Sequence, residues 1–328
     1  MLSLVALAVA ALPQVLAHGG VLSYENAGTV YQGWAPYNSP VGQTTIQRPW
    51  STYNPILSAT DPTIACNDDG TSGALQLTAT VAAGSDITAY WNQVWPHPYG
   101  PMLTYLAQCP GSTCTGVNAN TLKWFKIDES GLISGTIGDG YWGSGKMIDQ
   151  NSSWTTTVPA TVPSGNYLIR FETIALHSLP AQFYPECAQI QITGGGSRAP
   201  TADELVSFPG AYSNTDPGLT TDLYSNEAKT ETTYIIPGPP LYGSGTGRHN
   251  TPTTPSPHVC SPHVCSSHVY PSSNFHPKRP RCSQVRSMRR FWLHWLYDLR
   301  GRKYLPEAKR SVILNPSSKA LELILLLI

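Results

Sequence analysis

Charged residues are scarce in this sequence. Asp, Glu, Lys and Arg make up only 12% of its 328 residues, and their formal charges cancel at pH 7. Nucleic acids and acidic membrane surfaces are bound largely through excess positive charge, so we expect neither as a partner. The polar surface must come from uncharged side chains. With 28 Gly and 29 Pro, this composition fits a secreted β protein that handles an uncharged polymer.

Long apolar segments are also absent. The run from Leu2 to Leu16 and the final run from Leu321 to Ile328 are both too short to span a bilayer as a helix. The first run ends at Ala17, a small residue of the kind that precedes a signal-peptidase cut, although a basic n-region is lacking. We therefore interpret residues 1–17 as a signal peptide and expect a secreted, extracellular protein. Secretion makes the sequon at Asn151 a predicted glycosylation site.

Long stretches of helical periodicity are missing between Gly20 and about Pro240. Short apolar runs alternate there with turn residues. Four segments are predicted as strands: Ala74–Val81, Ile87–Trp91, Asn166–Thr173 and Ala188–Ile192. This spacing predicts an all-β fold, an antiparallel immunoglobulin- or fibronectin-like β-sandwich with long surface loops. The segment from Val21 to about Ala65 is rich in Tyr, Trp, Pro and Asn and is predicted as one large loop region.

Seven cysteines form an odd set, so at least one lies outside any disulfide framework. Four of them fall within the predicted sandwich and allow three pairings. Cys109 and Cys114 flank a short turn segment and can close a small loop. Cys66 and Cys187 would then form a long-range disulfide.

The composition changes abruptly after about Pro240. Residues 241–284 resemble a Ser/Thr/Pro-rich linker, and residues 285–328 form an irregular basic tail that we expect to be disordered. The repeated His-Val-Cys spacing near Cys260 matches no zinc finger. An alternative is a frameshift. Codon degeneracy allows Val285 to Leu299, read one nucleotide later, to encode a Gly- and Cys-rich string that looks like the start of a fungal family-one carbohydrate-binding module.

Three histidines stand in motifs of interest. If cleavage follows Ala17, His18 becomes the first residue and offers its α-amino group and its imidazole to one metal ion. The α-amino group has a pKa near ~7.7, so it can lose its proton at ordinary pH. His97 lies in the segment Trp95-Pro96-His97-Pro98-Tyr99-Gly100-Pro101, and His177 lies in Ile174-Ala175-Leu176-His177-Ser178-Leu179. Taken singly, each histidine would more often be a packed or surface residue.

Together with the segment Ala181-Gln182-Phe183-Tyr184-Pro185-Glu186-Cys187, these motifs resemble the fungal lytic polysaccharide monooxygenases of auxiliary activity family nine. The resemblance covers about Ala17 to Pro240 and includes Phe208–Tyr212 and Thr215–Gly218. It implies a catalytic domain over residues 18–240 that cleaves glycosidic bonds of cellulose by oxidation at C1, C4 or both, and so assists cellulases. The implied partners are crystalline cellulose or a related β-glucan, O2 or H2O2 as co-substrate and an external electron donor. We expect a monomer.

The resemblance also implies a copper site with one ion per catalytic domain. The His18 amino group, the His18 ring and the His97 ring would hold the ion, and Tyr184 would lie on its axial side. Three nitrogens in a tetragonal arrangement suit Cu(II). His177 and Gln182 would donate hydrogen bonds to the oxygen co-substrate. The implied catalytic residues are therefore His177, Gln182 and Tyr184.

One local departure concerns the second ligand. The family pattern is His-x-Gly-Pro, whereas Pro98 and Tyr99 both separate His97 from Gly100 here. The added residue affects the geometry of the loop. His97 is still the implied ligand, because no other histidine occurs between it and either of the other two motifs.

Aromatic side chains are the expected substrate contacts, because they stack on sugar faces at little cost in conformational entropy. Tyr212 matches a surface position of the family. Tyr24 is a second predicted substrate-binding residue, and Tyr31 and Trp34 in the same early region are further candidates.

Two other functions compete with this interpretation. A glycoside hydrolase needs two carboxylates about 5–9 Å apart across a cleft. Five carboxylates are available, but no motif pairs them: Glu172, Glu186, Asp128, Glu129 and Asp139. A non-catalytic carbohydrate-binding sandwich would need an aromatic surface but no free N-terminal histidine.

Overall fold

The computed structural model describes residues 18–244. Its two larger sheets have the strand orders β11-β6-β1-β2 and β5-β13-β12-β7-β8. The predicted signal peptide, nearly all of the linker-like segment, the basic tail and the frameshift hypothesis lie outside the described residues.

The four-stranded sheet contains β1 (Val21–Asn26), β2 (Thr29–Gln32), β6 (Asp86–Trp91) and β11 (Ser153–Thr157). The five-stranded sheet contains β5 (Ala79–Ala82), β7 (Met102–Gln108), β8 (Trp124–Ser130), β12 (Gly165–Ala175) and β13 (Gln182–Thr193). Small sheets pair β3 (Thr44–Thr45) with β4 (Leu75–Gln76), and β9 (Leu132–Ser134) with β10 (Tyr141–Trp142). One α-helix, α1 (Gly143–Asp149), and three 3-10 turns, η1 (Ala119–Thr121), η2 (Ala202–Glu204) and η3 (Glu227–Lys229), complete the described residues.

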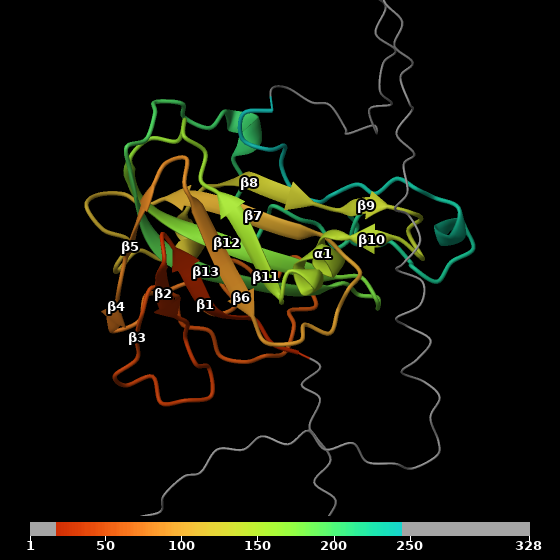
Figure 1. The fold of residues 1–328 in the computed structure, drawn as a ribbon, viewed down its shortest axis with the longest axis horizontal. Helices are drawn as coiled ribbons and strands as arrows, with labels where there is room; N and C mark the ends of the chain where they lie inside the picture. The colour runs from red at the N-terminus through yellow and green to blue at the C-terminus, as the bar shows by residue number, and fades with distance from the viewer. Residues whose placement is uncertain (1–17, 245–328) are drawn as a thin grey trace, which may run out of the picture. The chain divides into compact units, whose positions relative to one another are not determined.

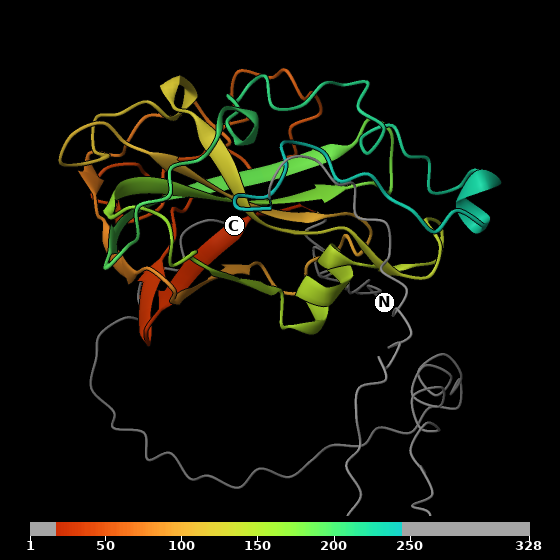
Figure 2. The same cartoon turned by 90° about the horizontal axis from the view of Figure 1, so that it is seen from above.

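The two larger sheets pack face to face as a β-sandwich. Their strands overlie one another in Figure 1, and Figure 2 separates the layers, with red β1 in one and green β12 and β13 in the other. Every pairing within these sheets is antiparallel except that of β5 with β13. The all-β sandwich expected from the sequence is therefore confirmed.

Two apolar clusters lie on opposite faces of the five-stranded sheet. One cluster draws on both sheets, with Val21 and Trp91 from one and Phe171 and Ile190 from the other. The second cluster lies between the outer face of the five-stranded sheet and the loops. Because both faces are covered, β12 is buried along nearly its whole length. This sheet therefore forms a rigid base for the loops at its ends.

The strand predictions are confirmed in β6, β12 and β13, and the predicted run Ala74–Val81 is divided between β4 and β5. The prediction of a single loop from Val21 to Ala65 is wrong at its start. Val21–Asn26 and Thr29–Gln32 form a hairpin, and β1 is paired on both sides because β6 lies along its other edge. Burial of Val21 and Tyr24 between the sheets stabilises β1.

Both predicted disulfides are formed. Cys66–Cys187 ties the long loop to β13 across 121 residues, and Cys109–Cys114 closes a small loop. None of the helices within residues 18–244 has the length and apolar character of a membrane span.

Candidate metal centre

His18 lies at the start of the described chain, three residues before β1. The short segment that follows it runs beside the end of β6, where the Asn92 amide donates to the Gly20 carbonyl at 3.3 Å. His18 is half-buried. Its position therefore depends on how this short N-terminal segment is held against the two sheets.

His97 lies on the loop between β6 and β7 and is 7% exposed. The Trp95 ring packs edge-on against it, and the Trp95 amide donates to the Ser152 hydroxyl at 2.9 Å. Gly100 has φ +145°, and a Cβ there would collide with the Ile174 carbonyl, so this close approach requires glycine. The Gly100 carbonyl in turn accepts a 2.6 Å bond from a serine hydroxyl of α1. The added residue of the loop is thus accommodated without releasing His97.

Tyr184 lies on β13, fully buried, with its phenol directed at His97. Its hydroxyl donates to Gln182 Oε1 at 2.8 Å and lies 3.2 Å from His97 Nε2. Burial raises the pKa of the Tyr184 phenol well above its ordinary value, and the nearby Glu186 carboxyl adds to this. The phenol is therefore neutral at ordinary pH, and the Nε2 atom of His97 faces its oxygen.

His177 and Gln182 flank the turn between β12 and β13, where Ala175 pairs with Gln182. The His177 ring stacks on His97 with centroids 4.4 Å apart. Burial lowers the pKa of His177 below its ordinary value, and the electrostatic effect of the neighbouring His18 adds to this. The His177 Nδ1 atom has no hydrogen-bond partner among residues 18–244. The structure thus brings both residues to the same end of the sandwich as His97 and Tyr184.

The spacing of the His18 and His97 rings fits a shared metal ion. Their centroids lie 6.1 Å apart. Two imidazoles on opposite sides of one ion, each at a metal–nitrogen distance of about 2 Å, would have centroids roughly 6 Å apart. The centroid of the Tyr184 ring lies 6.4 Å from that of the His18 ring and 5.6 Å from that of the His97 ring. In residues 18–244, no group of three or more His, Cys, Asp or Glu side chains is placed to hold a metal. The backbone nitrogen of His18 is a further nitrogen donor that cleavage before this residue would supply.

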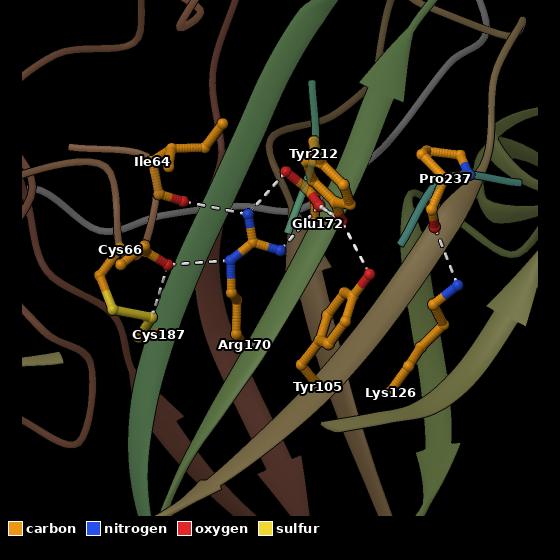
Figure 3. A network of polar contacts seen from close by, with 10 residues as sticks. Ile64, Cys66, Tyr105, Lys126, Arg170, Glu172, Cys187, Tyr212 and Pro237 are labelled. Carbon is orange, nitrogen blue, oxygen red and sulfur yellow. Dashed lines mark hydrogen bonds and ion pairs between the residues drawn. A yellow bond between two sulfur atoms is a disulfide. The ribbon is translucent and has the colours of Figure 1, made fainter. Parts of the chain in front are cut away.

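Two predicted substrate contacts are wrong. Tyr24 is 0% exposed because β1 packs its ring between the sheets against Phe171. Tyr212 is 4% exposed, and its hydroxyl donates to Glu172 at 2.7 Å and lies 2.8 Å from the Tyr105 hydroxyl. Figure 3 shows this phenol inside a buried network around Arg170. Neither ring can stack on a polymer surface.

The further candidates from the early region, Trp34 and Tyr31, are also largely buried. Trp34 is 7% exposed, and Tyr31 is half-buried against the core. An exposed tyrosine that the sequence patterns did not single out lies nearer the site. Tyr224 is 74% exposed, and its hydroxyl donates to the His177 carbonyl at 3.1 Å. A lone tyrosine in a polar loop carries no signal of this contact.

Three of the carboxylates that a hydrolase could use are buried or form ion pairs. Glu172 is 0% exposed and forms a 2.7 Å ion pair with Arg170. Glu186 is 1% exposed beneath the N-terminal segment. Glu129 binds the buried ammonium of Lys126 at 2.7 Å. These three groups therefore do not line a cleft as an acid–base pair.

Comparisons with known proteins show the family of this chain. The model of Auxiliary Activity family 9, formerly GH61, matches residues 18–234. The chain is 72% identical to the AA9 family lytic polysaccharide monooxygenase-like protein CEL1 of Agaricus bisporus, over 75% of this chain and 76% of that protein. It is 54% identical to AA9 family lytic polysaccharide monooxygenase B of Heterobasidion irregulare, over 70% of this chain and 93% of that protein.

Solved structures give the same result. The crystal structure of HiLPMO9B is similar with a TM-score of 0.66 at 53% identity, over 69% of this chain and 99% of that one. A cellulose-active polysaccharide monooxygenase from M. thermophila is similar with a TM-score of 0.61 at 38% identity, over 69% of this chain and 99% of that one. The chain belongs to auxiliary activity family 9, the lytic polysaccharide monooxygenases, and is an oxidoreductase acting on polysaccharide.

Proposed function

We propose that this chain is a secreted monooxygenase of cellulose whose mature form begins at His18. One copper ion would be held by the His18 amino group, the His18 ring and the His97 ring. The observation that supports this most directly is the 6.1 Å separation of the two rings, with the Tyr184 phenol facing His97 Nε2 at 3.2 Å. Three nitrogen donors would suit Cu(II), which also has the highest affinity among the first-row divalent ions for a given site of this kind.

Bound copper would supply the one-electron chemistry that activates O2 or H2O2, with electrons from an external donor. The protein would contribute placement and hydrogen bonding around that chemistry. Tyr184 would place a neutral phenol beside the ion, next to His97 Nε2. The side-chain carbonyl of Gln182 accepts from Tyr184, so the Gln182 amide nitrogen is the atom that can donate. In this structure that nitrogen donates to the Ser178 hydroxyl at 3.3 Å. His177 and Gln182 would thus act as donors to the oxygen co-substrate.

The proposed substrate is crystalline cellulose or a related β-glucan, cleaved at C1, C4 or both so that cellulases gain new chain ends. The cellulose activity named for the M. thermophila relative supports this class. Tyr224 is the proposed stacking residue, because its exposed ring is tied to the backbone of His177. A monomer is sufficient, since every proposed site residue comes from one chain.

Secretion follows from the proposed signal peptide, residues 1–17. Glycosylation at Asn151 would be compatible with the structure, because this residue is exposed. If the transcript encodes a carbohydrate-binding module in place of residues 285–328, a linker over residues 241–284 would tether the enzyme to the fibre and raise its local concentration.

The test is copper titration of the protein processed to begin at His18. We expect tight one-to-one binding and oxidised oligosaccharides from cellulose by mass spectrometry, with xyloglucan and mixed-linkage glucan as parallel substrates. One extra residue before His18 turns the amine into an amide and should abolish both, as should His97→Ala. The extended protein is the matched control, because its sandwich core is unchanged. Full copper affinity and activity in either variant would contradict the proposal.

A further inference from the structure

The segment from His18 to Val21 is held by buried side chains rather than by strand pairing alone. The Gly20 amide donates to Asn92 Oδ1 at 3.1 Å, and the Asn92 amide donates to the Gly20 carbonyl at 3.3 Å. The Val21 carbonyl accepts from Gln47 Nε2 at 3.0 Å. The Val21 amide faces the Glu186 carboxyl and favours its ionised form. Asn92 and Gln47, both distant in sequence, therefore satisfy three consecutive backbone groups of this segment, and the Glu186 carboxyl lies against it as well.

All three of these side chains are buried. Gln47 is 0%, Asn92 is 8% and Glu186 is 1% exposed. A Cβ at Gly20 would collide with the Glu186 carboxyl, so the segment can approach this carboxyl only with glycine there. The Asn67 side-chain amide donates to the same carboxyl at 3.3 Å. Asn67 and Glu186 are each next to a cysteine of the Cys66–Cys187 disulfide, which holds their two segments together.

Two of these contacts tie the N-terminal segment to elements that carry residues of the metal centre. Asn92 follows β6 and leads into the loop that carries His97. Glu186 lies two residues beyond Tyr184 on β13, so both side chains point to the same face of the strand. Buried hydrogen bonds of this kind fix distances, because a buried donor or acceptor left unpaired keeps the full free-energy cost of its desolvation.

We propose that Gln47, Asn92 and Glu186 form an N-terminal clamp that sets the position of the His18 amino group before metal binds. This inference rests on the proposed copper site and makes Asn92 and Glu186 positioning residues for it. Fixing the amine in advance removes an ordering cost from metal binding, so the clamp raises copper affinity. Either protonation state of Glu186 keeps an oxygen that can accept from Val21.

The test uses the mature protein that begins at His18. Asn92→Ala and Glu186→Ala each remove one acceptor, whereas Asn92→Asp and Glu186→Gln keep an oxygen in its place. We expect the alanine variants to bind one Cu(II) about 10-fold to 100-fold more weakly, with an altered EPR spectrum. In metal-free protein, their Gly20 and Val21 amides should exchange hydrogen faster. The conservative variants should stay close to the wild type in all three measurements.

Gln189→Ala provides a matched control. Gln189 is also buried on β13, but its side chain holds the Leu77 carbonyl and the Thr78 hydroxyl instead. This variant should lose stability while keeping the copper affinity and the EPR spectrum.

The clamp would be overturned if both alanine variants kept the copper affinity and the EPR spectrum of the wild type and their Gly20 and Val21 amides stayed protected from exchange. Fast exchange of the Gly20 and Val21 amides in the metal-free wild type would overturn it as well, so the test survives a variant that fails to fold. A wild-type protein that binds no copper would contradict the proposed function instead. Amide protection would then still report on the clamp.

Discussion

The imidazole rings of His97 and His177 lie parallel, with an interplanar angle of 6° and centroids 4.4 Å apart. This stack gives His177 two separable effects. Its flat face limits rotation of the His97 ring, and its ring nitrogens are available for hydrogen bonding. Trp95 packs edge-on against the same His97 ring. The ring of His97 is therefore restrained by aromatic neighbours before any ligand binds.

Substitutions of His177 separate these two effects. His177→Phe keeps an aromatic ring in the stack but removes both ring nitrogens. We expect copper affinity to change little and turnover on cellulose to fall by about 10²-fold to 10³-fold, as for the loss of one preorganised donor. His177→Ala should also weaken copper binding, because His97 loses its stacking partner. Titration calorimetry and product release measure the two quantities. Equal turnover in the Phe variant and the wild type would rule out a hydrogen-bonding role.

Removal of copper should lower the melting temperature without unfolding the protein. Metal binding only to the folded state stabilises it by about 4 kcal/mol when free copper is 1,000-fold above its Kd. For a domain of this size that corresponds to a shift of roughly 8–16 °C. The apo protein should stay folded because the sandwich and both disulfides do not depend on metal. Differential scanning calorimetry with and without a chelator measures the shift, and the N-terminally extended protein should show almost none.

Local patterns predicted the parts of the structure that depend on local chemistry. The apolar runs at β6, β12 and β13 were visible as strands, and the motifs around His97 and His177 identified residues that meet at one end of the sandwich. The hairpin of β1 and β2 was missed because β1 becomes a strand through its pairing with β6 and its burial by the other sheet.

The two tyrosine errors have the same origin. Tyr212 looked like a surface aromatic, but its hydroxyl is bound by Glu172, 40 positions away, and Tyr105, 107 positions away. The clamp residues Asn92 and Glu186 also act through contacts with a distant segment. Contacts that pair one side chain with a remote backbone group leave no periodicity or motif in a single sequence.

Tyr224 should contribute to cellulose binding and not to the metal site. Tyr224→Ala removes an exposed ring that is worth about 0.5–1.5 kcal/mol in an aromatic stack, so we expect binding to cellulose to weaken by roughly 2-fold to 12-fold. Copper affinity should be unchanged, since only the Tyr224 hydroxyl touches the His177 carbonyl. Pull-down with microcrystalline cellulose measures the effect. Tyr90→Ala is the control, because that ring lies on the four-stranded sheet with its hydroxyl on Glu25; equal losses in both variants would contradict a specific role.

Glu204 should make stability depend on pH in the acid range. The residue is 3% exposed, and its carboxylate accepts two bonds from Arg198, at 3.0 and 2.7 Å, and one each from the Thr201 and Gly243 amides at 2.9 Å. Burial opposes ionisation, but these donors outweigh it and lower the pKa of Glu204 to about 2. In the unfolded chain the pKa is about 4.3.

The sign of the effect follows from this difference. A carboxyl with a depressed pKa in the folded state contributes its full stabilisation above about pH 4.3 and loses it as the pH falls toward 2. The shift corresponds to at most about 3 kcal/mol, and we expect roughly 1–2 kcal/mol because water reaches the Arg198 side chain. Glu204→Gln should therefore lower the melting temperature at pH 7. The difference in melting temperature between this variant and the wild type should decrease steadily between pH 4.5 and pH 2.5. Comparing the two proteins at each pH cancels the titration of all other carboxyls. A difference in melting temperature that stays constant over this range would show that the charge of Glu204 is not the source of its contribution to stability.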